Sequence, residues 1–338
     1  MPTPPDSPRV LLFSTVYPPF IADDERMLRR HFRVEKKISA GFRALVTLPF
    51  AVLRNRVVLS WFGSVYAGYN TLLARLFGKI SIIVLAGVDA SKEPEINYGI
   101  WLSPWKSLVM RYTFRYADRL LVVDPSLGRE ARRLARYEGF NIEYIPFGFE
   151  PAEWAPGDGI REQVVLTVAS CENEWRLKKK GIDKLLAAAR ELHGVRFRLI
   201  GIHPPLLEKL KDRIPANVEA IPFVPRSELA SYYRRAKVYC QPSFTEGLPN
   251  TLCEAMLCGC IPVGTNAGGI PTAIGDAGYL VEYRDPPGLV DALRRALAAK
   301  DGVGREATKR IMSLFPLERR ETALAGAINA MAEAGRGR

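Results

Sequence analysis

Two carboxylates lie eight residues apart where a loop is expected to lead into a helix. Glu246 precedes a run of turn-forming residues, whereas Glu254 falls in an apolar-periodic segment that predicts the first turns of a helix. The free amide groups and positive dipole at the start of such a helix suit a phosphate. The pattern therefore predicts two carboxylates beside an anion-binding helix start.

Glu254 also has a purely structural interpretation. Thr251 and Glu254 are spaced as a capping box, in which the glutamate bonds back to the amide of the capping residue. Leu252, Ala255 and Met256 instead form one apolar stripe, which would face a core and turn Glu254 toward a cleft. Both interpretations are open from the spacing alone.

The segment from Phe244 to Pro271 resembles the signature of the large retaining glycosyltransferase family called group-1 or family-four transferases. That signature is a Glu, seven residues and a second Glu, then Ala-Met, a strand with Gly and Pro-Val, and a Gly-Gly-x-Pro loop. The residues that match are Glu246, Glu254, Ala255-Met256, Gly259 to Val263 and Gly268-Gly269-Ile270-Pro271. The resemblance implies the GT-B fold, in which two doubly wound, Rossmann-like α/β domains face each other across a cleft.

The resemblance also implies roles for these residues. Glu246 would contact the donor sugar and Glu254 the ribose of the nucleotide. The Gly268-Gly269 pair would let the backbone approach a ligand closely, with an ordinary turn as the alternative. Phosphate oxygens would be held by the backbone near Gly247, Leu248, Pro249, Asn250 and Thr251.

A basic loop follows the predicted strand from Val164 to Val168 and leads into another helix start. Its lysines could neutralise a diphosphate leaving group, although a charge run of this kind is often only a solvated loop. By resemblance, the Lys that contacts the donor phosphates is Lys180. The family's Gly-Arg pair is replaced by Ala169-Ser170, and Arg176 is the candidate for the missing charge.

The first half departs from the family pattern at two places. Relatives carry a sugar-contacting histidine where this chain has Ala86, and Asp89 is the nearest polar substitute. After the first predicted strand a stiff loop, Tyr17-Pro18-Pro19-Phe20-Ile21, stands where many relatives have a Gly-Gly pair. We therefore expect the acceptor side of the site to differ from that of relatives.

Alternating strand-like and helix-like segments run through both halves and predict parallel sheets covered by helices on both faces. Residues 1–150 are expected to form an acceptor-side domain and residues 151–316 a nucleotide-sugar-binding domain. A segment rich in helix breakers, residues 146–159, is expected to link them. A last helix, within residues 317–338, is expected to cross back to the first domain, as it does in GT-B proteins.

Composition limits the classes of protein that fit. No apolar run is long enough to span a bilayer, the start lacks a signal peptide, and five cysteines argue against a disulfide framework, so a cytoplasmic protein is expected. The net charge of +12 is shared by both halves. Basic-aromatic clusters at residues 26–37 and 111–119 could rest on anionic lipid at the inner membrane surface or meet an anionic acceptor, with simple solubility as the alternative explanation of the charge excess. No nucleic-acid-binding module is recognisable.

The expected reaction is metal-independent transfer of a sugar, with retention, from a UDP- or GDP-linked donor to a glycan, lipid-linked or small-molecule acceptor. The chain has no Asp-x-Asp, so a metal-bridged diphosphate is not expected, nor is a separate cofactor. The departures at Ala86 and Ala169-Ser170 motivate a second hypothesis, a catalytically weak sugar-nucleotide-binding partner subunit, against which the retained Glu246, Glu254 and Lys180 argue. An epimerase or phosphorylase of the same architecture is a third, by analogy of fold alone.

Overall fold

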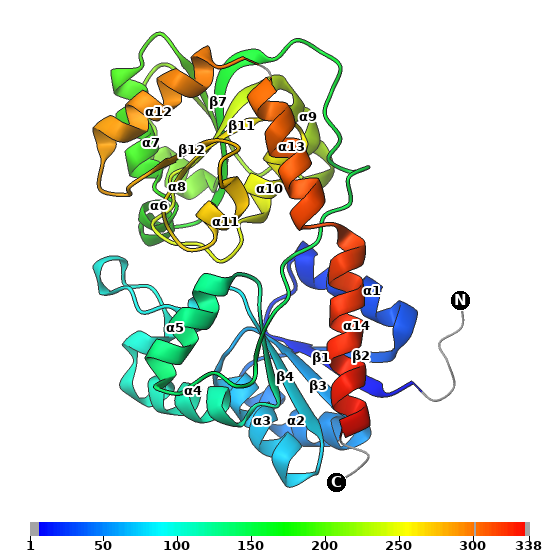
Figure 1. The fold of residues 1–338 in the computed structure, drawn as a ribbon. Coiled ribbons are helices and arrows are strands. Elements are labelled where there is room, and N and C mark those ends of the chain that lie inside the picture. Colours follow the sequence, from blue (N-terminus) through cyan, green and yellow to red (C-terminus); the bar gives the residue numbers. More distant parts are fainter. Residues whose placement is uncertain (1–6, 301, 335–338) are drawn as a thin grey trace. The chain divides into compact units, whose positions relative to one another are not determined.

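The computed structural model describes residues 7–300 and 302–334, which form two compact units (Figure 1). The first unit comprises Met1–Gly148 and Leu317–Arg338, and the second comprises Phe149–Pro316. Each unit contains one six-stranded sheet in which every pair of neighbouring strands is parallel. The predicted fold class of two doubly wound α/β units is confirmed.

The sheet of the first unit has the order β2-β1-β3-β4-β5-β6. Its central strands are short apolar runs buried on both faces, as expected when helices cover a parallel sheet from both sides. The strands are β1 (Arg9–Ser14), β2 (Arg33–Ile38), β3 (Val57–Trp61), β4 (Ile80–Leu85), β5 (Arg119–Val122) and β6 (Ile142–Tyr144).

The helices of the first unit pack as two groups. Helix α1 packs against α14, whereas α2 packs against α3, α3 against α4 and α4 against α5 (Figure 1). They are α1 (Pro19–His31), α2 (Gly41–Arg54), α3 (Val65–Leu76), α4 (Pro104–Tyr116), α5 (Pro125–Ala135) and α14 (Leu317–Ala334). Three single turns of 3-10 helix, Val88–Ala90, Pro94–Ile96 and Ile100–Leu102, lie between β4 and α4.

The loop expected at Tyr17 to Ile21 is shorter than the sequence suggests. Helix α1 begins at Pro19, with Pro18 as its N-cap, so Phe20 and Ile21 lie in the first helical turn. A proline is well suited to this position because its fixed φ matches the helix and its missing N–H would have no partner there. The expectation of a stiff Pro-Phe loop is therefore wrong, and the bulk of Phe20 packs against Trp61 and Phe147 instead.

The second unit has the strand order β12-β11-β10-β7-β8-β9. Its strands are β7 (Glu162–Cys171), β8 (Arg196–Ile202), β9 (Val218–Ile221), β10 (Ala236–Gln241), β11 (Ile261–Thr265) and β12 (Tyr279–Val281). Its helices are α6 (Glu174–Lys179), α7 (Ile182–Glu191), α8 (Pro204–Leu210), α9 (Arg226–Arg235), α10 (Asn250–Leu257), α11 (Ile270–Ile274), α12 (Pro286–Ala298) and α13 (Gly302–Leu314), with a 3-10 turn at Lys211–Arg213.

The breaker-rich segment at residues 146–159 contains the boundary between the units, which falls between Gly148 and Phe149. The residues after that boundary pack onto the second unit: the Trp154 ring is buried and meets the Tyr233 ring edge-on, with 5.9 Å between centroids. The segment is therefore anchored by apolar contacts although it has no regular secondary structure.

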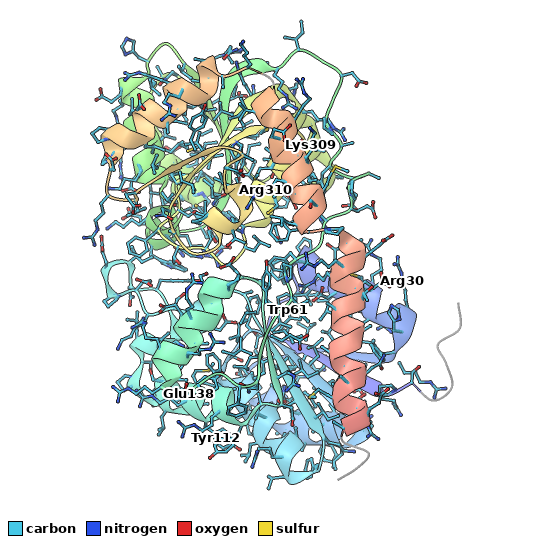
Figure 2. The ribbon with its side chains drawn as sticks, in the orientation of Figure 1. Arg30, Trp61, Tyr112, Glu138, Lys309 and Arg310 are labelled. Atoms are coloured by element: carbon cyan, nitrogen blue, oxygen red, sulfur yellow. The ribbon has the colours of Figure 1, made fainter. Side chains whose placement is uncertain are left out.

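A buried ion pair ties helix α14 to the rest of the first unit. Arg320 donates from Nε and Nη2 to the two carboxylate oxygens of Asp24 in α1, at 2.6 and 2.7 Å. Its Nη1 donates to the carbonyl oxygens of Ile145 and Pro146, at 3.1 and 2.7 Å. Figure 2 marks Trp61, whose ring lies 5.7 Å from the Arg320 guanidinium. Every polar atom of this pair is thus matched, which a buried charge requires.

The five cysteines are free and buried, as expected for a chain without a disulfide framework. Burial raises the pKa of Cys171 to about 11 and that of Cys258 and Cys260 to about 12, so these thiols are unreactive near neutral pH. Among the described residues, no helix is both long and apolar enough to cross a membrane.

Candidate active site

The candidate site lies where the strand order of the second unit reverses. Strand β7 is followed in the chain by β8 and β9 on one side, whereas β10, β11 and β12 continue on the other side of β7. Loops that follow β7 and β10 therefore leave the same edge of the sheet in opposite directions. In doubly wound sheets such a switch point opens a crevice for ligands. The residues expected to bind a donor come from these two loops, from the start of α10 and from the loop after β11 that carries Gly268-Gly269.

Glu246 is held in the loop between β10 and α10 by three donors. Its Oε1 accepts hydrogen bonds from Lys180 Nζ at 2.6 Å, Ser243 Oγ at 2.9 Å and Gln241 Nε2 at 3.4 Å. Its Oε2 faces Lys179 Nζ at 3.8 Å and accepts no hydrogen bond from any described residue. One carboxylate oxygen is thus fully engaged, and the other retains its capacity to accept.

The two lysines determine the charge of this carboxyl. Burial, which leaves the Glu246 side chain 9% exposed, would by itself raise the pKa, but Lys180 and Lys179 outweigh it and lower the pKa from 4.5 to about 2. Glu246 is therefore ionised near neutral pH. Two ammonium groups against one carboxylate leave one net positive charge at the sheet edge.

Lys179 and Lys180 are positioned by a short helix that the sequence did not suggest. Residues 174–179 form α6, and the basic-loop prediction for this segment is wrong, because Asn173 caps the helix by accepting from the Arg176 amide at 3.1 Å. The helix ends at Lys180, whose own amide donates to the Arg176 carbonyl at 2.9 Å. The capped helix thus directs the Lys180 side chain toward Glu246.

Gly181 allows this turn to approach the loop that holds Glu246. Its φ of 66° is in the left-handed region, and a Cβ there would lie 1.7 Å from the Pro242 carbonyl oxygen. Beside it, the Phe244 amide donates to the Lys179 carbonyl at 2.8 Å. Backbone contacts therefore join the loop after β7 to the loop after β10.

The Gly268-Gly269 pair supports Glu246 from the loop after β11. Gly268 has a φ of 56°, and a Cβ there would lie 1.9 Å from the Glu246 carbonyl oxygen. The Gly269 amide donates to that same oxygen at 3.2 Å. The close approach expected of these glycines is thus made to the protein backbone that carries Glu246.

Helix α10 begins at Asn250, after the loop residues Gly247, Leu248 and Pro249. Its N-cap is Pro249 and makes no side-chain cap hydrogen bond, so the capping-box interpretation of Thr251 and Glu254 is wrong. The first amide groups of the helix are consequently left for another acceptor. Among the described residues, the buried Oδ1 of Asn250 is also without a hydrogen-bond partner.

Glu254 is buried within the second unit. The predicted stripe of Leu252, Ala255 and Met256 is fully buried, but so is the rest of the helix from Leu252 to Leu257. Tyr233 donates to Glu254 Oε2 at 3.3 Å, and Arg226 Nε lies 3.7 Å from Oε1. Burial raises the pKa of Tyr233 well above its usual value, so the phenol is a neutral donor. The expectation that this face of the helix is open is therefore wrong.

Several residues at the site were missed by the sequence predictions, among them Gln241, Ser243 and Arg226. Gln241 and Ser243 hold Glu246, and Gln241 Oε1 also lies 3.4 Å from Thr251 Oγ1 and 3.1 Å from the Tyr239 hydroxyl. Arg226 faces Glu254. A usable signal for the first two was their position at and just after the end of a buried strand. No comparable signal pointed to Arg226, which lies in the first turn of α9.

Two predicted residues are placed differently from the rest. Arg176 lies in α6, 3.6 Å from Glu172 and over the Trp175 ring, and no contact joins it to Glu246. Asp89, in the first unit, is fully buried, and its oxygens accept from the backbone amides of Gly63, Ala86 and Gly87. Asp89 therefore fixes its own loop, and its role as a substitute for the sugar-contacting histidine stays a prediction.

No group of three or more His, Cys, Asp or Glu side chains suited to a metal ion occurs among the described residues. Within the part of the chain that the structure covers, the charges nearest to Glu246 come from Lys179 and Lys180.

The second unit matches a known protein family. Residues 162–299 match the model of the family described as Glycosyl transferases group 1. D-inositol 3-phosphate glycosyltransferase of Acidothermus cellulolyticus is 30% identical over 207 residues, covering 54% of this chain and 46% of that protein. Its counterpart from Geodermatophilus obscurus is 29% identical over 246 residues, covering 64% and 53%. The chain spans about half the length of the curated relatives it matches.

Solved structures resemble the whole chain. Sucrose-phosphate synthase from Thermosynechococcus elongatus superposes with a TM-score of 0.80 at 16% identity, over 97% of this chain and all of that one. HepE of Anabaena, solved in complex with UDP-glucose, gives a TM-score of 0.78 at 13% identity, over 96% of this chain and all of that one. At these identities the likeness shows the fold.

Proposed function

We propose that the chain transfers a sugar from a nucleotide-sugar donor to an acceptor hydroxyl, because residues 162–299 match the family of group 1 glycosyl transferases and the fold is that of GT-B proteins. The observation that carries this proposal is the Lys180–Glu246 pair at the switch point between β7 and β10. It places a carboxylate and a positive charge together where a doubly wound sheet receives its ligand.

Each part of a nucleotide-sugar has a counterpart in this site. The Glu246 Oε2 oxygen would accept a hydrogen bond from a hydroxyl of the donor sugar. Lys179, Lys180 and the first amides of α10 would hold the diphosphate, and their positive charge would stabilise it as it leaves. By the family signature Glu254 would contact the ribose, for which Tyr233 and Arg226 would have to move away from its carboxylate.

The finer features of the reaction rest on the family signature. We propose transfer with retention, a UDP- or GDP-linked donor, and no metal or further cofactor, since the sequence has no Asp-x-Asp and two lysines stand at the proposed diphosphate position. HepE was solved with UDP-glucose, which supports a donor of that class. A glycan, lipid-linked or small-molecule acceptor, met in the cytoplasm and at an anionic membrane surface, is part of the same proposal.

Nucleotide binding tests the donor site directly. Thermal unfolding with UDP, GDP, ADP or dTDP should show one nucleotide that raises the melting temperature, because a ligand that binds only the folded state stabilises it. Lys180→Ala should abolish that rise, whereas Lys178→Ala, an exposed lysine of the same helix, should not.

Turnover with the matching nucleotide-sugars then tests the reaction. Release of the nucleotide with an acceptor present is expected. If a nucleotide binds but no donor in a broad panel is hydrolysed or transferred, the transferase proposal fails and a binding partner subunit is the better reading. If no nucleotide binds at all, the donor site itself is rejected.

A further inference from the structure

Helix α2 carries apolar side chains on two opposite faces. Ala44, Leu48, Ala51 and Val52 are buried against β1, β3 and α3. On the other side Phe42, Leu45, Val46, Phe50 and Leu53 are exposed, with Phe42 80% and Phe50 59% accessible. At 100° per residue these five side chains fall on one arc about 140° wide. A contiguous apolar stripe that stays exposed on a folded chain marks a surface that binds something.

The exposed stripe continues over the neighbouring helices. Leu72 and Leu76 of α3 are exposed, as are Trp105 and Leu108 of α4. Because α2 packs against α3 and α3 against α4, these side chains belong to one layer of the first unit. We call the outer side of this layer, built from Gly41–Arg54, Val65–Leu76 and Pro104–Tyr116, the α2–α4 face.

The charges of the α2–α4 face are all of one sign. None of its three helices contains an Asp or Glu, and residues 36–88 hold seven Lys or Arg and no acidic residue. The six cations of these helices, Arg43, Arg54, Arg75, Lys106, Arg111 and Arg115, form no ion pair with any described acidic side chain. On the helical arc of α2, Arg43 and Arg54 lie at the edge of the apolar stripe.

Four of the six Lys and Arg side chains in the other basic cluster of this unit form ion pairs. In residues 26–37, Arg26 pairs with Asp23, Arg29 and Lys36 with Glu25, and Arg30 with Glu321 of α14. Figure 2 shows Arg30 beside α14. Contact between this cluster and lipid, as expected from the sequence, would require these pairs to break. The cluster at residues 111–119 fits better, because Arg111 and Arg115 lie on α4.

We infer that the α2–α4 face docks the protein on an anionic lipid surface, with the stripe of α2 inserted among the headgroups. Apolar side chains flanked by arginine, with aromatic rings at the rim, are what the interface of a bilayer takes up. A lipid surface fits better than a second copy of the chain, because two such faces would place unpaired cations against each other. The inference rests on the membrane contact of the proposed function and is independent of sugar transfer.

Sedimentation with vesicles tests this docking without any sugar donor. The full chain should bind phosphatidylcholine vesicles that contain about 30% phosphatidylglycerol and should bind pure phosphatidylcholine vesicles only weakly. Binding to the anionic vesicles should weaken at about 0.5 M salt. Phe42→Ser/Phe50→Ser should lower the partition coefficient on the anionic vesicles by about tenfold or more, because the two exposed rings that would enter the bilayer are lost. Phe223→Ser, an equally exposed phenylalanine in the second unit, is the matched control and should bind as the native chain does.

Arg43→Gln/Arg54→Gln should weaken binding to the anionic vesicles and reduce its dependence on salt, whereas Arg196→Gln/Arg295→Gln in the second unit should not. Native-like vesicle binding by both α2 variants would overturn the inference. A second result would also overturn it: the native chain is a dimer in solution, the Phe42/Phe50 variant is a monomer, and neither protein binds vesicles. Nucleotide binding by each variant, measured separately, shows whether the donor site has failed instead.

Discussion

Lys180 Nζ lies 2.6 Å from Oε1 of Glu246, although the two residues are far apart in the chain. The lysine ends a helix that follows β7, and the glutamate stands in the loop that follows β10. Each fixes the other: the lysine keeps the carboxyl ionised, and the carboxylate holds the long lysine side chain in one place. A donor would therefore meet a preformed charge arrangement.

Removing either partner should impair catalysis more than folding. We expect Glu246→Gln and Lys180→Ala each to lower kcat/KM by about a hundredfold or more, as loss of a group that stabilises a transition state typically does. Steady-state kinetics with the donor identified by nucleotide binding measures this. Lys178→Ala should leave kcat/KM within about twofold, and equal losses for Lys178 and Lys180 would show a general charge effect.

The low pKa of Glu246 predicts a specific acid sensitivity. Its pKa is about 2 in the folded chain against 4.5 as the ordinary value, so the unfolded chain binds the proton more readily as the pH falls. The resulting stabilisation, at most about 3 kcal/mol, is fully present above pH 4.5 and is lost between about pH 4.5 and 2.

This dependence can be measured by urea unfolding at pH values between 3 and 7, spaced about one pH unit apart. Glu246→Gln, which has no carboxyl to titrate, should show a shallower loss of stability over that range. Parallel curves for the two proteins would mean that the lysines do not hold the carboxyl as the structure indicates. Above pH 5, Glu246 should not contribute to the pH dependence of activity.

Gly181 and Gly268 are predicted to be intolerant of alanine. Both have a positive φ, and a Cβ would overlap the carbonyl oxygen of Pro242 or of Glu246. We expect Gly181→Ala and Gly268→Ala to lower the free energy of unfolding by at least about 2 kcal/mol each, from backbone strain and the clash together. They should also lower kcat, because the displaced backbone carries Glu246.

Gly194→Ala is the matched control for these substitutions. No atom lies within 4 Å of the position that its Cβ would take, and its φ is ordinary. Its stability should therefore stay within about 0.5 kcal/mol of the native chain. Tolerance of alanine at Gly268, in both stability and kcat, would show that the loop after β11 does not support the site.

Breaking the buried pair of Asp24 and Arg320 should lower the free energy of unfolding more than replacing both residues by apolar ones. Asp24→Leu leaves a buried guanidinium without its carboxylate, so we expect a loss of about 3–5 kcal/mol in the free energy of unfolding. Asp24→Leu/Arg320→Met removes both charges and should lose less than Asp24→Leu alone. Chemical denaturation of the two variants gives the comparison, and additive losses from Asp24→Leu and Arg320→Met would contradict it.

The sequence by itself determined most of the architecture, because periodicity is a local property. Apolar strands alternate with amphipathic segments, the strand expected from Val164 to Val168 lies within β7, and the last helix, Leu317–Ala334, lies within the residues expected for it. Short elements such as α6 and α11 were missed, since six or five residues carry too little periodicity and their formation depends on caps and tertiary contacts.

For the site, the family signature in the sequence named Glu246, Lys180 and the Gly268-Gly269 loop. Only the tertiary structure decided how they meet, because hydrogen-bond partners and burial depend on where distant loops leave the sheet. It showed that Gln241 and Ser243 hold Glu246, that no capping box involves Glu254, and that Asp89 bonds its own backbone. Ion pairs also distinguish Arg29 and Lys36, which pair with Glu25, from the cations of the α2–α4 face, which pair with no described acidic side chain, and composition does not contain that distinction.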